Sequence, residues 1–331
     1  MKKYTANDLT ELARGFQPAS ILIAAAELDV FTSLCQAPAG SADLANRMHA
    51  DPRGTEILLD ALASMGLLDK SGGVYAVPAD LAGMLTESGA ASILGTLRHQ
   101  GNCMQRWSQL ARVVLTGNAV LDMESVRGAD GDRESFIRAM HEISGRIAPA
   151  LVDSVAPLHF SHLLDVGGAS GTWTMLFLQH NPGAKATIFD LPEVLPLAAG
   201  AVNTPGMEGR IRLVAGDYLT DDLPGGADLA WLSAIVHQNS RAQNRALFRK
   251  AFAALVPGGT ILIRDIVMDE SRTTPMMGAF FAVNMLVSTP HGGTFTFGEL
   301  QEDLAAAGFA DIRLIRKGEA MDSVVAATCT A

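Results

Sequence analysis

Apolar residues in the second half of the chain come in short continuous runs, separated by stretches with helical spacing. Five runs predict strands, at residues 162–166, 185–190, 211–215, 228–233 and 260–266, with Pro257-Gly258-Gly259 as the turn before the last. Strands that are covered by helices on both faces have this pattern, because neither face meets water. The alternation therefore predicts an α/β fold with a doubly wound parallel sheet.

The first half of the chain has the three-to-four-residue spacing of amphipathic helices instead. Apolar positions share one helical face over residues 8–35, and Pro18 is expected to restart that helix. Further elements are predicted as helices at 42–48 and 52–65, capped by Ser41 and Asp51, and a two-stranded wing at 67–77. Helix, turn, helix and wing together indicate a winged-helix unit.

Between these halves we expect a helical stretch at 90–118, a polar loop at 122–133 and a long helix at 134–155. At 331 residues the chain is long for a single core, so two domains of ordinary size are expected. The predicted boundary divides a mostly helical domain at residues 1–105 from an α/β domain at residues 106–331.

The charge balance argues against a nucleic-acid partner. The formal net charge is -10, the pI is about 5.2, and no local run of Lys and Arg offsets this, whereas phosphate contacts need clustered basic residues. If the winged unit bound DNA, its second helix would contact the bases. That helix carries Arg53, Glu56 and Asp60 rather than a basic, amide-rich face. We therefore expect this unit to have a structural or dimerisation role.

Cysteine usage and the N-terminal sequence indicate a reducing compartment and no membrane anchor. Cys35, Cys103 and Cys329 are odd in number and far apart, so neither a disulfide framework nor a metal site is expected. Charged residues interrupt the N-terminus before a signal core forms, and the apolar run at 21–26 is much shorter than the roughly 20 residues of a membrane helix. A cytoplasmic location is expected.

The first predicted strand ends in Asp165-Val166 and runs into the glycine-rich loop Gly167-Gly168-Ala169-Ser170-Gly171. Glycines at such a turn let the backbone approach a ligand closely. A dinucleotide fingerprint needs a glycine at position 166, where this chain has valine. The spacing Asp-x-Gly-x-x-x-Gly is the one used by S-adenosylmethionine enzymes, although glycine turns also follow strands that bind nothing.

Acidic residues follow the next two predicted strands. Asp190, 25 positions after Asp165, is placed to accept hydrogen bonds from both hydroxyls of a ribose. Asp217 suits an adenine amino group, with Tyr218 as a face on which the ring stacks. Each carboxylate by itself is equally consistent with a cap on the next helix. Their order beside one glycine loop favours a nucleotide-like cofactor.

In this order of motifs the chain resembles the S-adenosylmethionine-dependent O-methyltransferases of the plant caffeate and bacterial polyketide type. The resemblance covers nearly the whole chain and rests on residues 165–171, Phe189-Asp190-Leu191-Pro192, Gly216-Asp217, residues 232–237, Pro257-Gly258-Gly259 and, upstream, Phe136-x-x-x-Met140-x-x-x-Ser144. It implies a Rossmann-like catalytic domain preceded by a winged-helix dimerisation domain that lends residues to the partner's active site. A homodimer follows from it.

The resemblance also implies roles for individual residues. Cofactor contacts are implied for Ser144, Asp165, Gly167, Gly168, Asp190, Leu191, Asp217, Tyr218 and Ser233, of which Ser144 is similar to a serine that binds the cofactor carboxylate. His237 matches the catalytic base, and Asp265 matches the first of two acids that flank it. The acceptor pocket is expected to be lined by Met140, Phe280, Phe281, Asn284 and Met285, with His99 and His291 as accessory donors or structural residues.

A histidine suits methyl transfer from a sulfonium, because the acceptor must lose a proton as the sulfur becomes neutral. Neutral imidazole, with an ordinary pKa of about 6.5, takes a proton from a phenol at physiological pH. Asp265 would orient the ring of His237. Outside such a motif, a lone histidine at a strand end is more often a hydrogen-bonded structural residue.

Three positions depart from the family pattern. The family follows its histidine with Asp-Trp, where this chain has Gln238-Asn239. The second flanking acid is expected just after the glycines near 292, but no acid follows them until Glu299, which is expected to start the next helix. Ala169 replaces the middle glycine of the loop. An acidic phenol or a nucleophilic carbon as acceptor would need less help from the histidine.

The leading hypothesis is a homodimeric methyltransferase that transfers the methyl group of S-adenosyl-L-methionine to a phenolic or aromatic hydroxyl of a small molecule, leaving S-adenosyl-L-homocysteine. A C- or N-methyltransferase on the same scaffold is the runner-up. A non-catalytic regulator that binds S-adenosylmethionine is the competitor from another class, and a DNA-binding regulator is disfavoured by the acidic charge.

Overall fold

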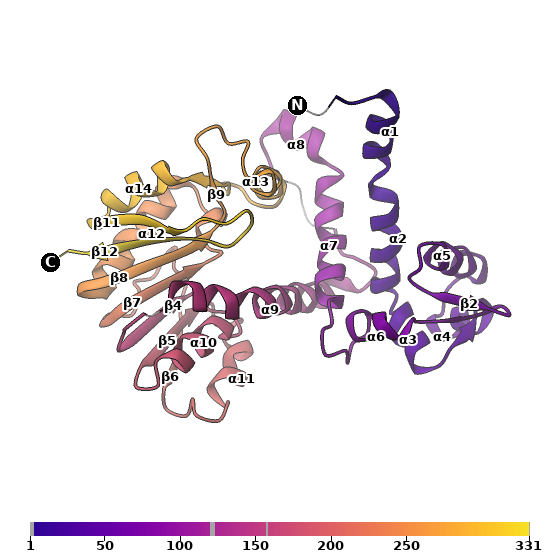
Figure 1. The fold of residues 1–331 in the computed structure, drawn as a ribbon, viewed down its shortest axis with the longest axis horizontal. Helices are drawn as coiled ribbons and strands as arrows, with labels where there is room; N and C mark the ends of the chain where they lie inside the picture. Colours follow the sequence, from indigo (N-terminus) through magenta and orange to yellow (C-terminus); the bar gives the residue numbers. More distant parts are fainter. Residues whose placement is uncertain (1–2, 120–122, 157, 331) are drawn as a thin grey trace. The chain divides into compact units, whose positions relative to one another are not determined.

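The computed structural model describes residues 3–119, 123–156 and 158–330. The chain divides into two compact units, an N-terminal unit of residues 1–108 and 121–143 and a C-terminal unit of residues 109–120 and 144–331 (Figure 1). The predicted domain boundary between residues 105 and 106 stays a prediction, since a division into compact units does not test where a functional domain begins.

Three helices open the N-terminal unit: α1 (Ala6–Arg14), α2 (Phe16–Glu27) and α3 (Val30–Gln36). The prediction that Pro18 restarts the helix is wrong, because the break lies at Gly15 and Pro18 falls in the first turn of α2. Proline is tolerated there because an N–H in the first turn has no intrahelical partner. A second break follows at Asp29, whose φ is 56°.

The two predicted helices and the two-stranded wing are present. They are α4 (Ser41–Met48), α5 (Pro52–Ser64), β2 (Asp69–Ser71) and β3 (Val74–Ala76), and β1 (Ala39–Gly40) completes a sheet of order β1-β3-β2. Asp51 caps α5 by accepting from the Gly54 N–H at 2.6 Å, as expected, whereas α4 starts at Ser41 itself. Tyr75 is buried and donates its hydroxyl to Asp60 at 2.6 Å.

The connecting segments differ from two predictions. The predicted helix at 90–118 is broken at Ser108-Gln109 into α7 (Leu94–Trp107) and α8 (Leu110–Thr116), after the short α6 (Ala79–Leu85). The predicted loop at 122–133 is wrong from Gly128 on, because α9 (Gly128–Val155) begins there; residue 122 lies outside the described residues. The prediction rested on the polar composition of this segment, but a helix turn that faces water is polar as well.

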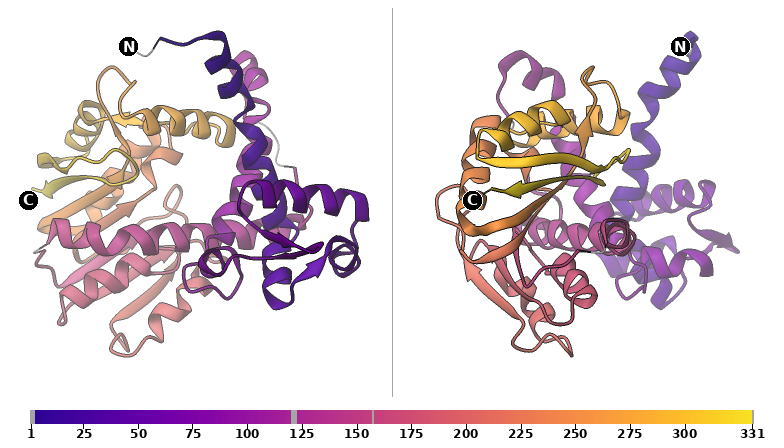
Figure 2. Two further views of the ribbon diagram at one scale, coloured as in Figure 1. Left: turned by 45° about the vertical axis from the view of Figure 1, so that its right-hand side comes forward. Right: turned by 60° about the vertical axis from the view of Figure 1, so that its left-hand side comes forward.

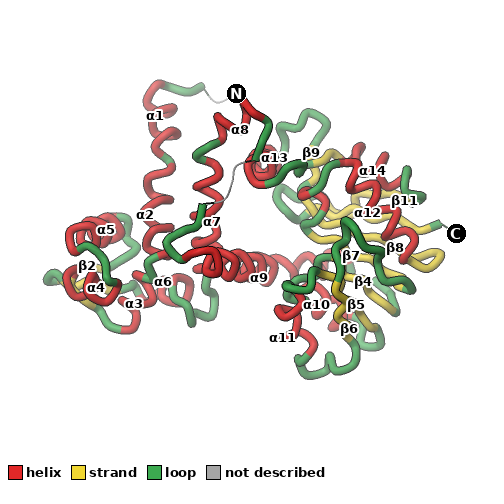
Figure 3. Tube along the Cα trace, turned by 180° about the vertical axis from the view of Figure 1, so that it is seen from behind, coloured by secondary structure: helices red, strands yellow, loops and turns green. Residues whose placement is uncertain are grey.

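The C-terminal unit contains one seven-stranded sheet of order β11-β12-β8-β7-β4-β5-β6 (Figure 3). The strands are β4 (His162–Val166), β5 (Lys185–Asp190), β6 (Ile211–Ala215), β7 (Ala227–Ser233), β8 (Leu255–Asp265), β11 (Phe309–Arg316) and β12 (Ser323–Cys329). The first five are mutually parallel, which confirms the predicted strands and sheet type. The sequence analysis missed β11 and β12, which add an antiparallel edge.

Pro257-Gly258-Gly259, predicted as the turn before the last parallel strand, lies within the bounds of β8. The pairing with β7 jumps there from Ala227↔Leu255 to Leu229↔Thr260, so the strand is irregular at these residues. Gly258 takes a left-handed φ of 81°, which favours glycine.

Helices cover both faces of this sheet, and the core is divided accordingly (Figure 2). The remaining elements are α10 (Thr172–His180), α11 (Ala199–Val202), α12 (Arg241–Ala254), α13 (Met276–Ser288), α14 (Phe297–Ala305), the 3-10 turns η1 (Leu195–Ala198) and η2 (Val236–Gln238), and the parallel pair β9 (Val267–Met268) and β10 (Phe295–Thr296). One core contains Trp173, Phe177 and Trp231, and the other lies beneath α12 and α14. The sheet is therefore the doubly wound one that the sequence predicts.

Within the described residues, no single helix has the length and apolar character needed to cross a bilayer. One bent pair, Ala6–Glu27 followed by Val30–Gln36 at 57°, meets the length and composition criteria.

Candidate active site

The carboxyl ends of five parallel strands lie along one edge of the sheet in the order β8-β7-β4-β5-β6. Ligands of open α/β sheets bind at this edge, because the loops that leave the strands expose backbone groups and side chains there. Most of the predicted site residues end or follow these strands, and all except Met140 and His99 belong to the C-terminal unit.

The glycine loop after β4 has a conformation that needs its glycines. Gly167 has a φ of 69° and donates its N–H to the Phe189 carbonyl at 2.8 Å. A Cβ at Gly167 would lie 2.4 Å from Ile235 Cδ1, and one at Gly168 would lie 2.8 Å from Asp165 Cγ. Ala169 also has a positive φ, 46°, so the loop keeps its path without the family's middle glycine.

Asp165 lies beneath this loop and is 1% exposed. It accepts a hydrogen bond from Thr174 Oγ1 at 2.6 Å, which ties the strand to α10. Burial raises the pKa of Asp165 to about 7, and the charge of Asp190 acts in the same direction. The carboxyl group thus supports the loop from the protein interior.

This burial predicts a pH-dependent stability. The pKa rises from 3.8 in the unfolded chain to about 7 in the folded one, so the folded state holds the extra proton over that window. Asp165 contributes its full stabilisation below the unfolded-state pKa of 3.8. As the pH rises from there to the folded-state pKa of about 7, this contribution falls by about 1.4 kcal/mol per pH unit. We expect Asp165→Asn to remove this loss, so that urea unfolding shows the variant to gain stability relative to the wild type between pH 5 and pH 8. The exposed Asp222→Asn serves as control, and an equal difference at both pH values would contradict the shift.

Asp190 ends β5 and points back to the loop. Its Oδ2 accepts from the Ala169 N–H and its Oδ1 from the Leu191 N–H, both at 2.8 Å. Burial raises the pKa of this half-buried carboxyl. Each carboxylate oxygen has two lone pairs, so both can still accept a further bond from a diol.

Asp217 and Tyr218 follow β6, as predicted. Asp217 Oδ1 accepts from the Leu219 N–H at 2.8 Å, which fixes the turn. Tyr218 is half-buried, and burial raises the pKa of its phenol. Its hydroxyl lies 3.4 Å from Asn239 Oδ1 on the segment after η2. The ring is thereby held at the sheet edge between two strand ends.

The structure brings His237 and Asp265 together, as the sequence analysis expects. His237 lies in η2 after β7, is 6% exposed, and places Nδ1 3.0 Å from both Asp265 oxygens. A carboxylate only accepts, so Nδ1 carries a proton, and in the neutral imidazole Nε2 is then the nitrogen with the lone pair. Asp265 is held in turn by the N–H of Ile266 at 2.8 Å. The Phe281 ring meets the imidazole edge-on, with 4.8 Å between centroids.

α13 supplies the other predicted acceptor contacts of this unit. Phe281 and Asn284 are half-buried and Met285 is buried, whereas Phe280 is 51% exposed. After α13, the Gly293 N–H donates to the His237 carbonyl at 2.8 Å, and a Cβ at Gly292 would lie 2.6 Å from that oxygen. The absence of a side chain at Gly292 therefore lets this loop close against the histidine turn.

Glu299 lies in the first turn of α14, which begins two residues earlier than expected, at Phe297, and its carboxylate is engaged within the protein. It forms a capping box with Thr296, accepting from its N–H at 3.0 Å, and pairs with Arg272. Ser144 is half-buried on α9, and Met140 lies on the same helix in the N-terminal unit. His291 is exposed.

Two features of the site were not predicted from the sequence. The first is a pair of buried amides: Asn244 Nδ2 donates to the Val236 carbonyl at 2.9 Å, and Asn239 Nδ2 donates to Asn244 Oδ1 at 3.1 Å. This pair holds η2. The unusual Gln238-Asn239 sequence is the signal from which it could have been found. The second is Arg264, a buried arginine in β8.

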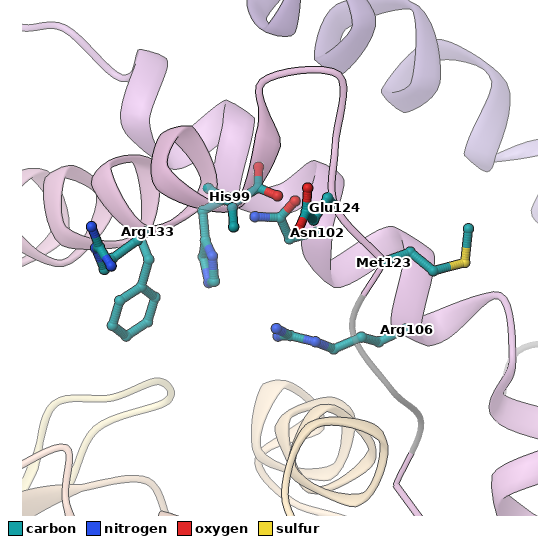
Figure 4. A pocket seen from close by; sticks show the side chains of 9 residues that line it. His99, Asn102, Arg106, Met123, Glu124 and Arg133 are labelled. Atoms are coloured by element: carbon teal, nitrogen blue, oxygen red, sulfur yellow. The ribbon is translucent and has the colours of Figure 1, made fainter.

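The N-terminal unit contains a cavity of about 420 Å³ between α7, α9 and the segment that connects them. In Figure 4 the side chains of His99, Asn102 and Arg106 extend from one face of α7 toward it. Burial lowers the pKa of His99, as does the charge of Arg106 to a smaller extent, so its imidazole is neutral. The ring lies edge-on to Phe136, with 5.2 Å between centroids. These contacts agree with the structural reading of His99.

Among the described residues, no group of three or more His, Cys, Asp or Glu side chains is arranged to hold a metal ion.

Comparison with known proteins agrees with this architecture. The O-methyltransferase domain family matches residues 115–310, and the O-methyltransferase dimerisation domain family matches residues 10–88. The chain is 32% identical to 3-hydroxy-5-methyl-1-naphthoate 3-O-methyltransferase of Streptomyces sahachiroi, over 93% of this chain and 90% of that protein. It is 31% identical to human acetylserotonin O-methyltransferase, over 96% of both.

Solved structures give the same result. The crystal structure of human N-acetylserotonin methyltransferase in complex with SAM superposes with a TM-score of 0.82 at 30% identity and covers 100% of this chain and 99% of that one. PigF with SAH has a TM-score of 0.86 at 25% identity and covers 98% and 100%. The chain belongs to the S-adenosylmethionine-dependent O-methyltransferase family, with a dimerisation domain at its N-terminus and a catalytic domain built on a doubly wound sheet.

Proposed function

We propose that this enzyme methylates a hydroxyl group on an aromatic small molecule, with His237 as the general base and Asp265 as the residue that orients it. The observation that carries the proposal is the buried His237–Asp265 pair, which stands at the end of β7 next to the strand that bears the glycine loop. A histidine in that position can receive the proton that a hydroxyl loses during methyl transfer.

The residues at the sheet edge fit S-adenosylmethionine. Gly167 and Gly168 carry no side chains, so a ligand can approach the backbone of this loop closely. Asp190 can accept further hydrogen bonds from a ribose diol. Tyr218 and Asp217 would hold the adenine, with Leu191, Ser144 and Ser233 as further contacts, and Asp165 would act from below the loop. Once bound, the cofactor supplies a methyl group on a positively charged sulfur.

The protein's part in the reaction is to position the acceptor and remove its proton. Nδ1 of His237 is occupied by Asp265, so the free Nε2 is the atom that accepts the proton. The carboxylate of Asp265 then stabilises the imidazolium, because the two are in direct contact in a buried position. Such a base is worth about 100- to 10,000-fold in rate.

The expected acceptor is flat and apolar. Phe281 and Met285 offer apolar surface and Asn284 a polar group, and we propose Met140 as a further contact. The relatives act on a hydroxynaphthoate and on acetylserotonin according to their names, so both support an aromatic hydroxyl as the target.

A direct assay tests the proposal. The purified chain is incubated with S-adenosylmethionine labelled with ¹³C at the methyl group and with 3-hydroxy-1-naphthoate, 1-naphthol or N-acetylserotonin. We expect the label to appear in an aryl methyl ether, with one S-adenosylhomocysteine formed per ether. Label on carbon or nitrogen would instead support the runner-up activity, and binding of S-adenosylhomocysteine without any transfer would support a non-catalytic protein.

We also propose that the enzyme is a homodimer formed by a winged-helix domain at residues 1–105. The helices at its start leave apolar side chains in water: Leu9, Leu12 and Phe16 are 54%, 69% and 61% exposed, and α1 buries none of its residues. These three lie three or four positions apart on one helical face, so a partner would cover them together. A cytoplasmic location stays a prediction from the sequence.

Substitution on this face should separate the subunits. Leu12→Asp combined with Phe16→Asp places two charges in the proposed interface, where they cannot be solvated. We expect the double variant to sediment as a monomer of 34.9 kDa, while the wild type sediments at twice that mass. Gln17→Asp adds a charge at an exposed polar neighbour and should leave the dimer intact. A double variant that remains dimeric would show that another surface forms the interface.

A further inference from the structure

Arg264 is a buried arginine for which the described residues supply no counter-ion. It is 3% exposed, and among the described residues no carboxylate lies within ion-pair distance of its guanidinium. Asp265 turns to His237 on the other side of the strand, and Asp322 pairs with Arg316 at 3.1 Å. Within the same described residues, the buried Nε of Arg264 has no hydrogen-bond partner. An isolated buried charge is costly, so its presence calls for a compensating group.

The position of Arg264 indicates which group that is. It is the penultimate residue of β8 and pairs in register with Ser233, the last residue of β7. Its guanidinium lies over the Trp173 ring at 4.8 Å, in the first turn of α10. α10 begins directly after the glycine loop, and its N-cap residue, Gly171, has no side chain with which to cap it. A helix N-terminus and a buried arginine side chain each favour an anion.

Ser233 adds a directed hydrogen bond to this arrangement. Arg264 Nη1 donates to Ser233 Oγ at 2.9 Å, so the serine oxygen acts as an acceptor toward the arginine. The hydroxyl proton is then free to point to another acceptor. Serine, arginine and helix terminus together match a carboxylate, which accepts several charge-assisted hydrogen bonds.

We propose that Arg264, with Ser233, recognises a ligand carboxylate at the edge of the sheet, namely the amino-acid carboxylate of S-adenosylmethionine. This inference rests on the proposed cofactor site, where the glycine loop and Ser144 serve the same end of the cofactor. Burial lowers the pKa of Arg264 to about 10, which still leaves it charged at neutral pH. The acceptor could supply the carboxylate instead, and the experiment separates the two sources.

Calorimetry with two adenosine ligands tests the proposal without turnover. S-adenosylhomocysteine has the amino-acid carboxylate, whereas 5′-methylthioadenosine keeps the adenosine and the thioether but lacks it. We expect Arg264→Gln to weaken S-adenosylhomocysteine binding by at least tenfold and to leave 5′-methylthioadenosine binding unchanged, because only the first ligand loses a charge-assisted bond. Arg264→Lys keeps the charge, so its affinity for S-adenosylhomocysteine should lie between those of the wild type and Arg264→Gln. The exposed Arg313→Gln should bind both ligands like the wild type.

The acceptor arm uses 3-hydroxy-1-naphthoate and 1-naphthol. If Arg264→Gln weakens only the binding of 3-hydroxy-1-naphthoate, Arg264 recognises a carboxylate that belongs to the acceptor rather than to the cofactor. Equal loss of both adenosine ligands together with a lowered unfolding midpoint, or unchanged binding of all four compounds, would overturn it. A wild type that binds neither adenosine ligand would contradict the proposed cofactor site itself, which is a different failure.

Discussion

Replacing His237 by alanine should lower kcat/KM for a phenolic acceptor by about 100- to 10,000-fold, the usual contribution of a positioned general base. The loss is expected in turnover rather than in cofactor affinity, because the imidazole pairs with Asp265 and packs against Phe281, which the proposal places outside the cofactor site. Steady-state kinetics with 3-hydroxy-1-naphthoate, beside calorimetry with S-adenosylhomocysteine, measures both quantities.

Two further variants make the result specific. His180→Ala removes an exposed histidine at the far end of α10 and should keep wild-type activity. Asp265→Asn keeps the shape of the pair but removes the charge that stabilises the imidazolium, so it should lose activity without losing the fold. Turnover of His237→Ala at the wild-type rate would remove this residue from the role of base and favour an acceptor that needs no deprotonation.

The second large effect is expected on cofactor binding. Asp190→Ala should raise the Kd for S-adenosylhomocysteine by about 100-fold or more, since it deletes two charge-assisted hydrogen bonds to the ribose, each worth about 1.5–3 kcal/mol. The same change removes the acceptor for the Ala169 N–H, so the glycine loop loses one of its fixed points. Calorimetry measures the Kd directly.

Asp190→Asn separates these two causes. The amide keeps one oxygen for a backbone N–H but offers only one acceptor side to a diol, so an intermediate Kd is expected. Asp222→Ala, an exposed acid close in sequence to the site, should bind like the wild type. Unchanged binding by Asp190→Ala would mean that the ribose is held by other residues and that Asp190 serves only the loop.

The elements that carry the site were predictable because their signals are local. A buried parallel strand leaves a continuous apolar run, and the bounds of β4, β5 and β6 agree with the predicted ones residue by residue. The helix starting at Pro52 was predictable because Asp51 and Pro52 are a local capping signal. The elements missed, such as the start of α9 in a polar segment, have no distinct local signal.

The order of sequence motifs identified some residues of the site and not others. Motif order identified His237 and Asp265, and the structure places them in contact although they are 28 positions apart. The sequence analysis did not identify the amide pair of Asn239 and Asn244 or the buried Arg264. Asparagine and arginine are common at protein surfaces, so neither indicates a site until its burial and its partners are known. The exposed apolar face of α1 is likewise visible only once burial is known.

The sequence by itself determined the sheet type, the cofactor loop and the family, since these depend on the order of short segments along the chain. Only the tertiary structure decided which side chains are buried and which of them meet. Nδ1 of His237 lies against Asp265, Oδ2 of Asp190 holds the glycine loop through the Ala169 N–H, and Arg264 lies beside Ser233 with no counter-ion among the described residues. The physical reason is that a parallel sheet brings together strand ends that are far apart in sequence. The glycine loop could therefore be identified from its own residues, whereas the chemistry of the sheet edge required all five strands in place.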